Sequence, residues 1–210
     1  PSLITNSSNG KITEGSNGYL DLSKHVTLKE VNASSDKSAG DVHAGGNPHF
    51  YNSPEETFKI ATAIYEKLID IDSNNFDYYD ANYKAFEKKY NEKLKEWNLK
   101  LEKIKNIQIV EYHKSFIYLN EWAKLQSVGA IEPKPGIPPS AGHIAKLLSS
   151  LKSKDVKFVF QEIYNKNSLT ESFAKKAKAK IITIPTMVGA EKGINNIFDK
   201  FDKIVDMLCE

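Results

Sequence analysis

Residues 75–105, NFDYYDANYKAFEKKYNEKLKEWNLKLEKIK, decide how this chain is organised. The large apolar residues recur every three or four positions, at Phe76, Tyr79, Tyr83, Phe86, Tyr90, Leu94, Trp97, Leu101 and Ile104. Lysine, asparagine and acidic residues fill most of the gaps, and neither proline nor glycine interrupts the stretch. This one-sided stripe predicts an amphipathic helix of about 45 Å, at about 1.5 Å per residue. Because a small domain needs no rod of that length, we interpret it as the spine between two lobes.

The amino-acid composition limits the classes of protein to which this chain can belong. With 210 residues, of which 40% are apolar, the chain is large enough for one domain or two small ones, each with a core. All 29 basic residues are lysine, and against 27 acidic residues the net charge is only +2. Nucleic-acid-binding proteins usually have a basic stripe with arginine, so we expect no nucleic-acid partner. The single cysteine, Cys209, excludes an internal disulfide and a cysteine-based zinc cluster.

The first 48 residues are rich in serine, asparagine, glycine and lysine. Only two short apolar patches, at 19–22 and 26–28, offer strand or turn material, so we expect a mobile loop or a surface layer here. The chain opens at Pro1 in a loop-like composition, which indicates a mature or cut product. No apolar run in the sequence approaches the roughly 18 residues that a membrane-spanning helix needs.

Strands and helices alternate after the spine. Before it, Ser53 and Pro54 mark the N-cap and the first position of a helix that ends near Asp70. Residues 72–74 form the next break and are expected to cap the spine helix. After it, short apolar runs predict strands at 107–112, 127–131, 156–160 and 181–184, with helices at 116–125, 140–153, 169–179 and from about 193. Nearly continuous apolar strands separated by helices predict a parallel sheet that is covered on both faces. The predicted fold class is therefore α/β.

Polar residues at the strand ends predict a binding site. Right-handed crossovers place the carboxyl ends of parallel strands at one edge of the sheet, where open sheets bind ligands. His113 ends the first strand, Glu132 follows the second and Glu162 ends the third. His49, in the loop before the first helix, reaches the same cleft if two lobes face each other. Histidine with carboxylates suits Zn²⁺ or Mn²⁺.

Structural roles for the same residues stay open at this point. A histidine at a strand end is more often hydrogen-bonded within the fold than bound to a metal, and a glutamate there can accept backbone N–H groups. His43 lies six positions before His49 and matches no strong metal signature, and HExxH and CxxC patterns are absent. His25 is expected in an exposed loop and His143 on a helix face, without a functional role.

Five segments of the chain resemble a known family in the same order. They are GDVHAGGNPHF at 40–50, YHKS at 112–115, EPKPGIPPS at 132–140, QEIY at 161–164 and PTMVG at 185–189. They resemble the zinc- and manganese-binding solute-binding proteins of ABC importers, and the resemblance extends from about Gly15 to the end of the chain. It implies two lobes with parallel sheets covered by helices, joined by one long rigid helix, with the metal between the lobes.

The resemblance also implies a ligand set. His49 and His113 match two ligand positions of the family, Glu132 is the candidate third ligand, and His43 or Glu162 is expected to complete the shell.

The resemblance also implies how the chain is divided into domains. Residues 1–73 are the remainder of the N-terminal lobe, 74–106 the connecting helix and 107–210 the C-terminal α/β lobe. In the family the first lobe starts with a strand–helix portion that usually carries another histidine ligand. We expect this portion to lie before Pro1.

The implied function is that of a carrier and not of an enzyme. It captures Zn²⁺ or Mn²⁺ on the periplasmic or extracellular face of the cell membrane and delivers the ion, as a monomer, to the transmembrane permease of an ABC transporter. Lipid anchoring is left open. One alternative is a metal-dependent hydrolase that recruits Glu162 or Glu132 as general base, although no nucleophile motif is present. Another is a coiled-coil interaction protein, although about four heptads with many aromatic residues suit packing against lobes better.

Overall fold

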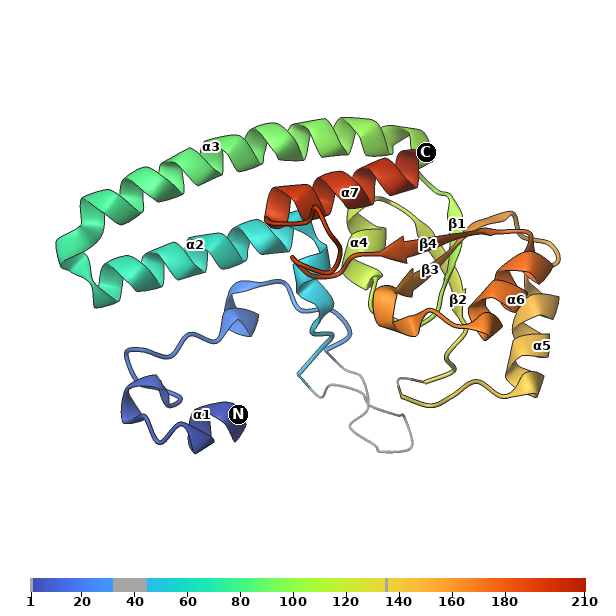
Figure 1. The fold of residues 1–210 in the computed structure, drawn as a ribbon, viewed down its shortest axis with the longest axis horizontal. Helices are drawn as coiled ribbons and strands as arrows, with labels where there is room; N and C mark the ends of the chain where they lie inside the picture. Colours follow the sequence, from blue (N-terminus) through green and yellow to red (C-terminus); the bar gives the residue numbers. More distant parts are fainter. Residues whose placement is uncertain (1, 32–44, 135) are drawn as a thin grey trace.

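A computed structural model describes residues 2–31, 45–134 and 136–210 (Figure 1). The α-helices are α1 (Ser2–Asn6), α2 (Pro54–Ile71), α3 (Phe76–Leu101), α4 (Ile117–Trp122), α5 (Ala141–Ser150), α6 (Ser168–Ala177) and α7 (Ile197–Cys209). The strands are β1 (Gln108–Glu111), β2 (Gln126–Ala130), β3 (Val156–Glu162) and β4 (Lys180–Ile184). Short 3-10 turns are η1 (Gly10–Ile12), η2 (Leu22–His25), η4 (His49–Asn52), η5 (Ser73–Asn75), η6 (Glu102–Ile104) and η7 (Ile163–Asn165).

The four strands form one parallel sheet in the order β2-β1-β3-β4. Val110 of β1 lies opposite Val159 of β3, and Phe160 of β3 lies opposite Ile182 of β4. Parallel neighbours need crossover connections, and the helices predicted between the strands supply them. The predicted α/β class with a parallel sheet is confirmed.

Both faces of this sheet are buried. Ile109 and Phe160 belong to a core with residues of α3, α4 and α7, whereas Val110 and Val159 belong to a second core with residues of α5 and α6. Successive residues of a strand point to opposite faces, so a strand that is buried on both sides is apolar throughout. This is why the strands showed no alternation in the sequence.

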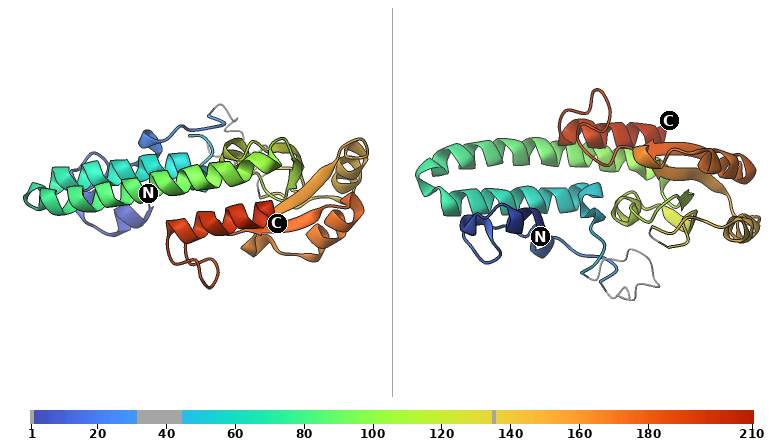
Figure 2. Two further views of the ribbon diagram at one scale, coloured as in Figure 1. Left: turned by 90° about the horizontal axis from the view of Figure 1, so that it is seen from above. Right: turned by 60° about the horizontal axis from the view of Figure 1, so that its bottom comes forward.

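Helices α2 and α3 form an antiparallel hairpin that extends away from the sheet (Figures 1 and 2). Its contact is largely aromatic: Tyr65 stacks on Tyr83 with ring centroids 4.4 Å apart, and Thr62 Oγ1 lies 2.7 Å from the Tyr83 hydroxyl. Nearer the sheet, the buried Tyr90 hydroxyl donates to the Pro54 carbonyl oxygen at 2.8 Å. The hairpin therefore fixes the start of α2 relative to α3.

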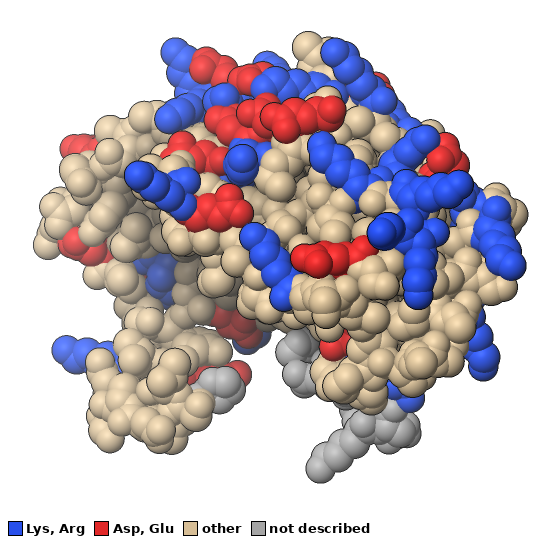
Figure 3. All heavy atoms as spheres, turned by 45° about the vertical axis from the view of Figure 1, so that its right-hand side comes forward, with Lys and Arg blue, Asp and Glu red and all other residues tan. Residues whose placement is uncertain are grey.

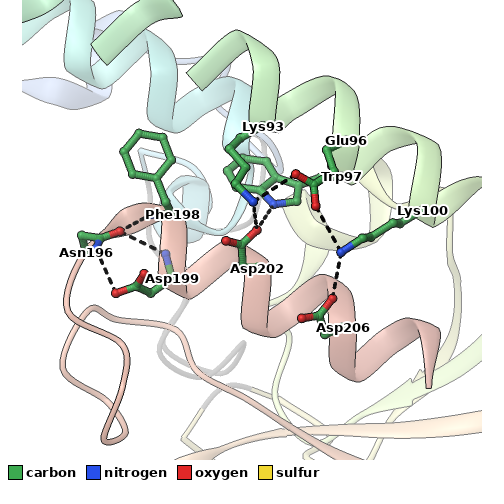
Figure 4. Close-up of polar contacts among 9 residues, drawn as sticks. All are labelled: Lys93, Glu96, Trp97, Lys100, Asn196, Phe198, Asp199, Asp202 and Asp206. Atoms are coloured by element: carbon green, nitrogen blue, oxygen red, sulfur yellow. Dashed lines mark hydrogen bonds and ion pairs between the residues drawn. The ribbon is translucent and has the colours of Figure 1, made fainter. Parts of the chain in front are cut away.

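Helix α7 packs along α3 through a row of polar contacts (Figure 4). The Asp202 carboxylate accepts a hydrogen bond from the fully buried Trp97 at 2.7 Å and forms an ion pair with Lys93 at 3.0 Å. One turn later Asp206 forms an ion pair with Lys100 at 3.1 Å. Since α7 follows β4, these contacts attach the end of the chain to the long helix.

The burial of α3 differs from the prediction. The stripe is buried only in its second half, at Tyr90, Trp97 and Leu101, whereas Phe76 is 45% exposed. The first turns of α3 pack on α2, and further along Phe86 contacts Phe198 of α7, with ring centroids 5.7 Å apart. That α3 connects two lobes stays a prediction, and so do the predicted domain boundaries, because the described residues before α2 contain no strand.

Two helix starts were also predicted imperfectly. Residues 72–74 were expected to cap α3, but its N-cap residue Asn75 makes no side-chain capping bond and instead donates to Asp72 at 2.8 Å. The last helix was expected from about Gly193 and begins at Ile197, where Asn196 accepts from two backbone N–H groups. Both errors arise because several neighbouring residues are good caps, and only the backbone angles select among them.

The segment before α2 lies partly along that helix. The two patches predicted as strand or turn material, at 19–22 and 26–28, are joined by the 3-10 turn η2, and the Thr27 N–H donates to Glu56 of α2 at 2.8 Å. Within the described residues, no helix combines the length and the apolar character required to cross a membrane. Lysine and acidic side chains lie next to one another over the upper part of the face in Figure 3, in keeping with the low net charge.

Candidate metal site

The turn after β1 presents His113. The Glu111 side chain, which is 4% exposed, accepts from the Phe116 N–H at 3.3 Å and from the Asn120 amide at 3.1 Å. Burial raises the pKa of this carboxyl group. Within the turn, the Ser115 N–H donates to the His113 carbonyl oxygen at 2.8 Å. The buried Glu111 carboxylate therefore holds together the loop that carries His113.

Strand pairing brings Glu132 to the same place. The Glu132 N–H donates to the Tyr112 carbonyl oxygen at 2.9 Å, so the chain after β2 continues beside the chain after β1. One carboxylate oxygen of Glu132 is hydrogen-bonded to His113 Nδ1, and the other accepts from the Gly136 N–H at 3.0 Å. Glu132 thus links the histidine turn to the proline-rich loop.

Two asparagine side chains attach the His49 turn to the His113 turn. Asn47 donates to the Lys114 carbonyl oxygen at 3.2 Å, and Asn52 donates to the Ser115 carbonyl oxygen at 3.1 Å. Asn47 is 8% exposed and Asn52 is fully buried, and buried amides of this kind need such partners. The two segments are remote in sequence and are bonded directly to each other.

The imidazole rings of His49 and His113 consequently face each other. Their centroids are 5.8 Å apart and their planes meet at 83°. His49 Nδ1 lies 2.9 Å from the Tyr51 hydroxyl, and the His49 backbone N–H donates to Asn47 Oδ1 at 3.0 Å. The predicted convergence of these two histidines at the carboxyl edge of the sheet is present in the structure.

Glu162 is buried at the end of β3. Its carboxylate accepts hydrogen bonds from the Ser115 hydroxyl and from the Asn165 amide, the latter at 2.8 Å. Burial, and then the negative charge of Glu162, raise the pKa of the Tyr51 hydroxyl. The Tyr51 hydroxyl therefore stays protonated at neutral pH.

These side chains do not form a complete metal shell. In the described parts of the chain, no three histidine, cysteine, aspartate or glutamate residues are placed so that they could hold one metal ion. His43 lies outside the described residues. His143, on α5, contacts the Ala130 carbonyl oxygen through Nε2 at 3.0 Å.

Sequence reasoning missed the residues that hold the histidines. These are Asn47, Tyr51, Asn52, Ser115 and Glu111. Asn47 and Ser115 lie within the family-like segments, but nothing in the sequence indicates which carbonyl an asparagine side chain reaches.

The arrangement around His113 suits metal binding. Histidines that bind a metal usually donate their other ring N–H to a carboxylate, which fixes the tautomer and the orientation of the ring. Glu132 occupies this position on Nδ1 of His113. The Nε2 atom of His113 is thereby left as the ring nitrogen that would bind a metal.

Known proteins share this fold. A crystal structure of ZnuA superposes with a TM-score of 0.72 and 22% sequence identity, covering 90% of this chain and 68% of that chain. The solute-binding protein FpvC from Pseudomonas aeruginosa in complex with Mn²⁺ superposes with a TM-score of 0.66 and 20% identity, covering 86% of this chain and 67% of that one.

Sequence comparison gives the same relationship. The high-affinity zinc uptake system protein ZnuA of Bacillus subtilis (strain 168) is 26% identical over 146 residues, which are 70% of this chain and 46% of the relative. The chain thus spans about half the length of this relative. A family model described as "Zinc-uptake complex component A periplasmic" matches residues 3–209. Because the match takes in nearly every residue, the chain belongs to this family, ZnuA.

Proposed function

We propose that the chain captures Zn²⁺ outside the cytoplasm as the solute-binding part of an ABC importer. The observation that carries the proposal is the pair of facing imidazoles, His49 and His113, each with a hydrogen-bond partner on Nδ1. The family to which the chain belongs is one of transport components. The site lies at the carboxyl edge of a parallel sheet, where such sheets bind ligands.

Each residue of the site has a proposed role. His49 and His113 bind the metal, and Glu132 orients His113 through its hydrogen bond to Nδ1 of that ring. Glu162 is the proposed carboxylate ligand and exchanges its bonds to Ser115 and Asn165 for the metal. His43 is the other proposed ligand. Two histidines are prepositioned among the described residues, and binding completes the shell by moving further donors inward.

The ligand chemistry favours zinc over manganese. Imidazole suits Zn²⁺, whereas Mn²⁺ is better served by carboxylate, carbonyl and water oxygens. Two histidines with one carboxylate therefore bind zinc more tightly. Competition between the two ions for the metal-free protein tests this order, and tighter manganese binding would contradict it.

The proposal also covers location, partner and assembly. The chain acts at the periplasmic or extracellular face of the membrane and passes its metal to a transmembrane permease, as a monomer and without nucleic acid. It is not an enzyme. Neither the family nor the relatives support the hydrolase alternative, and Glu132, its nearest candidate base, is bonded to His113 and Gly136.

Metal titration tests the proposal. The purified chain is stripped of metal, titrated with Zn²⁺ against a chromophoric chelator, and weighed by native mass spectrometry. We expect one zinc ion per chain and no turnover of generic esters or phosphoesters. Absence of zinc binding, or hydrolysis that depends on zinc, would overturn the assignment.

A further inference from the structure

Lys200 of α7 is a buried cation that the metal site as described does not use. The side chain is 2% exposed, and burial lowers its pKa to about 7. An unpaired buried charge is destabilising, so such a lysine needs a compensating role.

The ammonium group of Lys200 forms its polar contacts with described residues in one turn. The ammonium group donates to the Tyr51 carbonyl oxygen at 2.7 Å and lies 3.5 Å from Asn52 Oδ1. It also lies over two aromatic rings, 5.4 Å from the centroid of Tyr51 and 4.8 Å from that of Phe201. Tyr51 and Asn52 are the last two residues of η4, which His49 begins.

These two residues control the geometry of both histidines. The Tyr51 hydroxyl contacts His49 Nδ1, whereas the Asn52 amide donates to the Ser115 carbonyl oxygen in the turn after His113. With its oxygen toward Lys200, the Asn52 amide turns its NH₂ group toward Ser115. The ammonium group thus contacts the point at which the two histidine turns are joined.

The helix that carries Lys200 is itself fixed. Asp202 and Asp206 attach α7 to Trp97, Lys93 and Lys100 of α3 (Figure 4). A side chain on such a helix holds its partners more precisely than one on a loop.

We propose that Lys200 is a positioning residue of the metal site, which fixes the η4 turn so that His49 faces His113. This inference rests on the proposed function. Lys200 binds no metal, because it acts only through Tyr51 and Asn52.

Substitution of Lys200 tests the proposal in the full chain. Lys200→Met keeps the length and removes the donor, and Lys200→Gln keeps a donor on a shorter side chain. Lys203→Met is the matched control, because Lys203 is an exposed lysine of the same helix. We expect zinc affinity to fall about tenfold or more in Lys200→Met, less in Lys200→Gln, and not at all in Lys203→Met. If Lys200→Met does not fold, Lys200→Gln carries the comparison.

A double-mutant cycle separates positioning from general damage. If Lys200 acts through His49, Lys200→Met has little further effect on zinc affinity once His49 is alanine. An equal loss of affinity with and without His49 would refute the proposal, as would unchanged affinity in both Lys200 variants.

A metal-free measurement keeps this inference distinct from the proposed function. In ¹H–¹⁵N spectra of the imidazole groups, Lys200→Met or Lys200→Gln shifts the His49 signals, whereas Lys203→Met leaves them in place. If the wild-type chain binds no zinc, the proposed function fails while the spectra still test Lys200. Unshifted His49 signals in both Lys200 variants would overturn the positioning role.

Discussion

Both histidines of the site are held through Nδ1, and by chemically different partners. Glu132 is a carboxylate on His113, whereas Tyr51 offers a neutral hydroxyl to His49. A carboxylate strengthens the donor power of the imidazole that it contacts. At the scale of single residues, His113 is therefore expected to be the stronger of the two ligands.

Removing either histidine should weaken zinc binding. His49→Ala or His113→Ala deletes a direct donor, so each lowers the affinity at least tenfold, about 1.4 kcal/mol, with the larger loss for His113→Ala. Competition with a chromophoric chelator measures both. His25→Ala is the control, because His25 is exposed on the surface turn η2. Wild-type affinity in both site variants would mean that the two rings do not share a metal.

Lys200 also gives the fold a pH dependence. The pKa of a lysine is about 10.4 in an unfolded chain, and burial lowers the pKa of Lys200 to about 7. Between these values the unfolded state binds more protons than the folded state, so the free energy of unfolding rises with pH. Below about pH 7 the folded state carries the full penalty of the buried ammonium group.

Lys200→Met removes this titration. Urea unfolding of both proteins between pH 7 and 9.5 should show the wild-type chain gaining stability relative to the variant as the pH rises. At pH 7 the variant should be at least as stable, since a buried charge is replaced by an apolar side chain of similar size. Parallel stability curves would show that Lys200 does not titrate in this range.

At the scale of the element, the second half of α3 has one buried face and one exposed face. Leu101 is 3% exposed in the core with α7 and the sheet, and Leu99, two positions away, is 74% exposed. Helical periodicity separates them onto opposite faces. The face that carries Leu101 is therefore the one that packs on the rest of the protein.

This contrast gives a matched pair of variants. Leu101→Ala should lower the free energy of unfolding by about 2–5 kcal/mol through the lost contacts and the cavity. Leu99→Ala should change it by no more than about 0.5 kcal/mol, because it touches little. Denaturant unfolding followed by circular dichroism gives both values. Similar losses in the two variants would mean that the face assigned to the core is wrong.

At the scale of the whole molecule, the metal would join segments from both sides of α3. His49 precedes α2, and His113 follows β1. A ligand that binds only the folded arrangement stabilises it by mass action. Zinc binding should thus be visible as global stability.

Free zinc at 100 times its dissociation constant should raise the free energy of unfolding by about 2.7 kcal/mol. For a chain of this size that corresponds to an increase in melting temperature of roughly 5–10 °C. Thermal unfolding with and without zinc measures the shift, and the His49→Ala, His113→Ala double variant is the control. A shift of equal size in that control would place the stabilising metal elsewhere.

The sequence predicted the elements well, and for a physical reason. Short apolar runs form the middle of β1, β3 and β4, and the helices between these strands are periodic or capped, so local pattern and burial agree. The errors lie at α3, where Phe76 fits the stripe and is nevertheless exposed. A stripe shows which face of a helix is apolar but not how far along its length a neighbour extends.

The sequence by itself determined the α/β class, the parallel sheet and the gathering of His113, Glu132 and Glu162 at the edge formed by the strand ends, because periodicity and chain direction are local properties. Only the tertiary structure decided that His49 faces His113, that Glu132 engages His113 and that Glu162 is bonded to Ser115 and Asn165. The position of His49 depends on the side chains of Asn47, Asn52 and Lys200, which bond to residues far away in the chain. A hydrogen bond of this kind is selected by the three-dimensional position of its partner, and that position exists only once the helices and the sheet have packed.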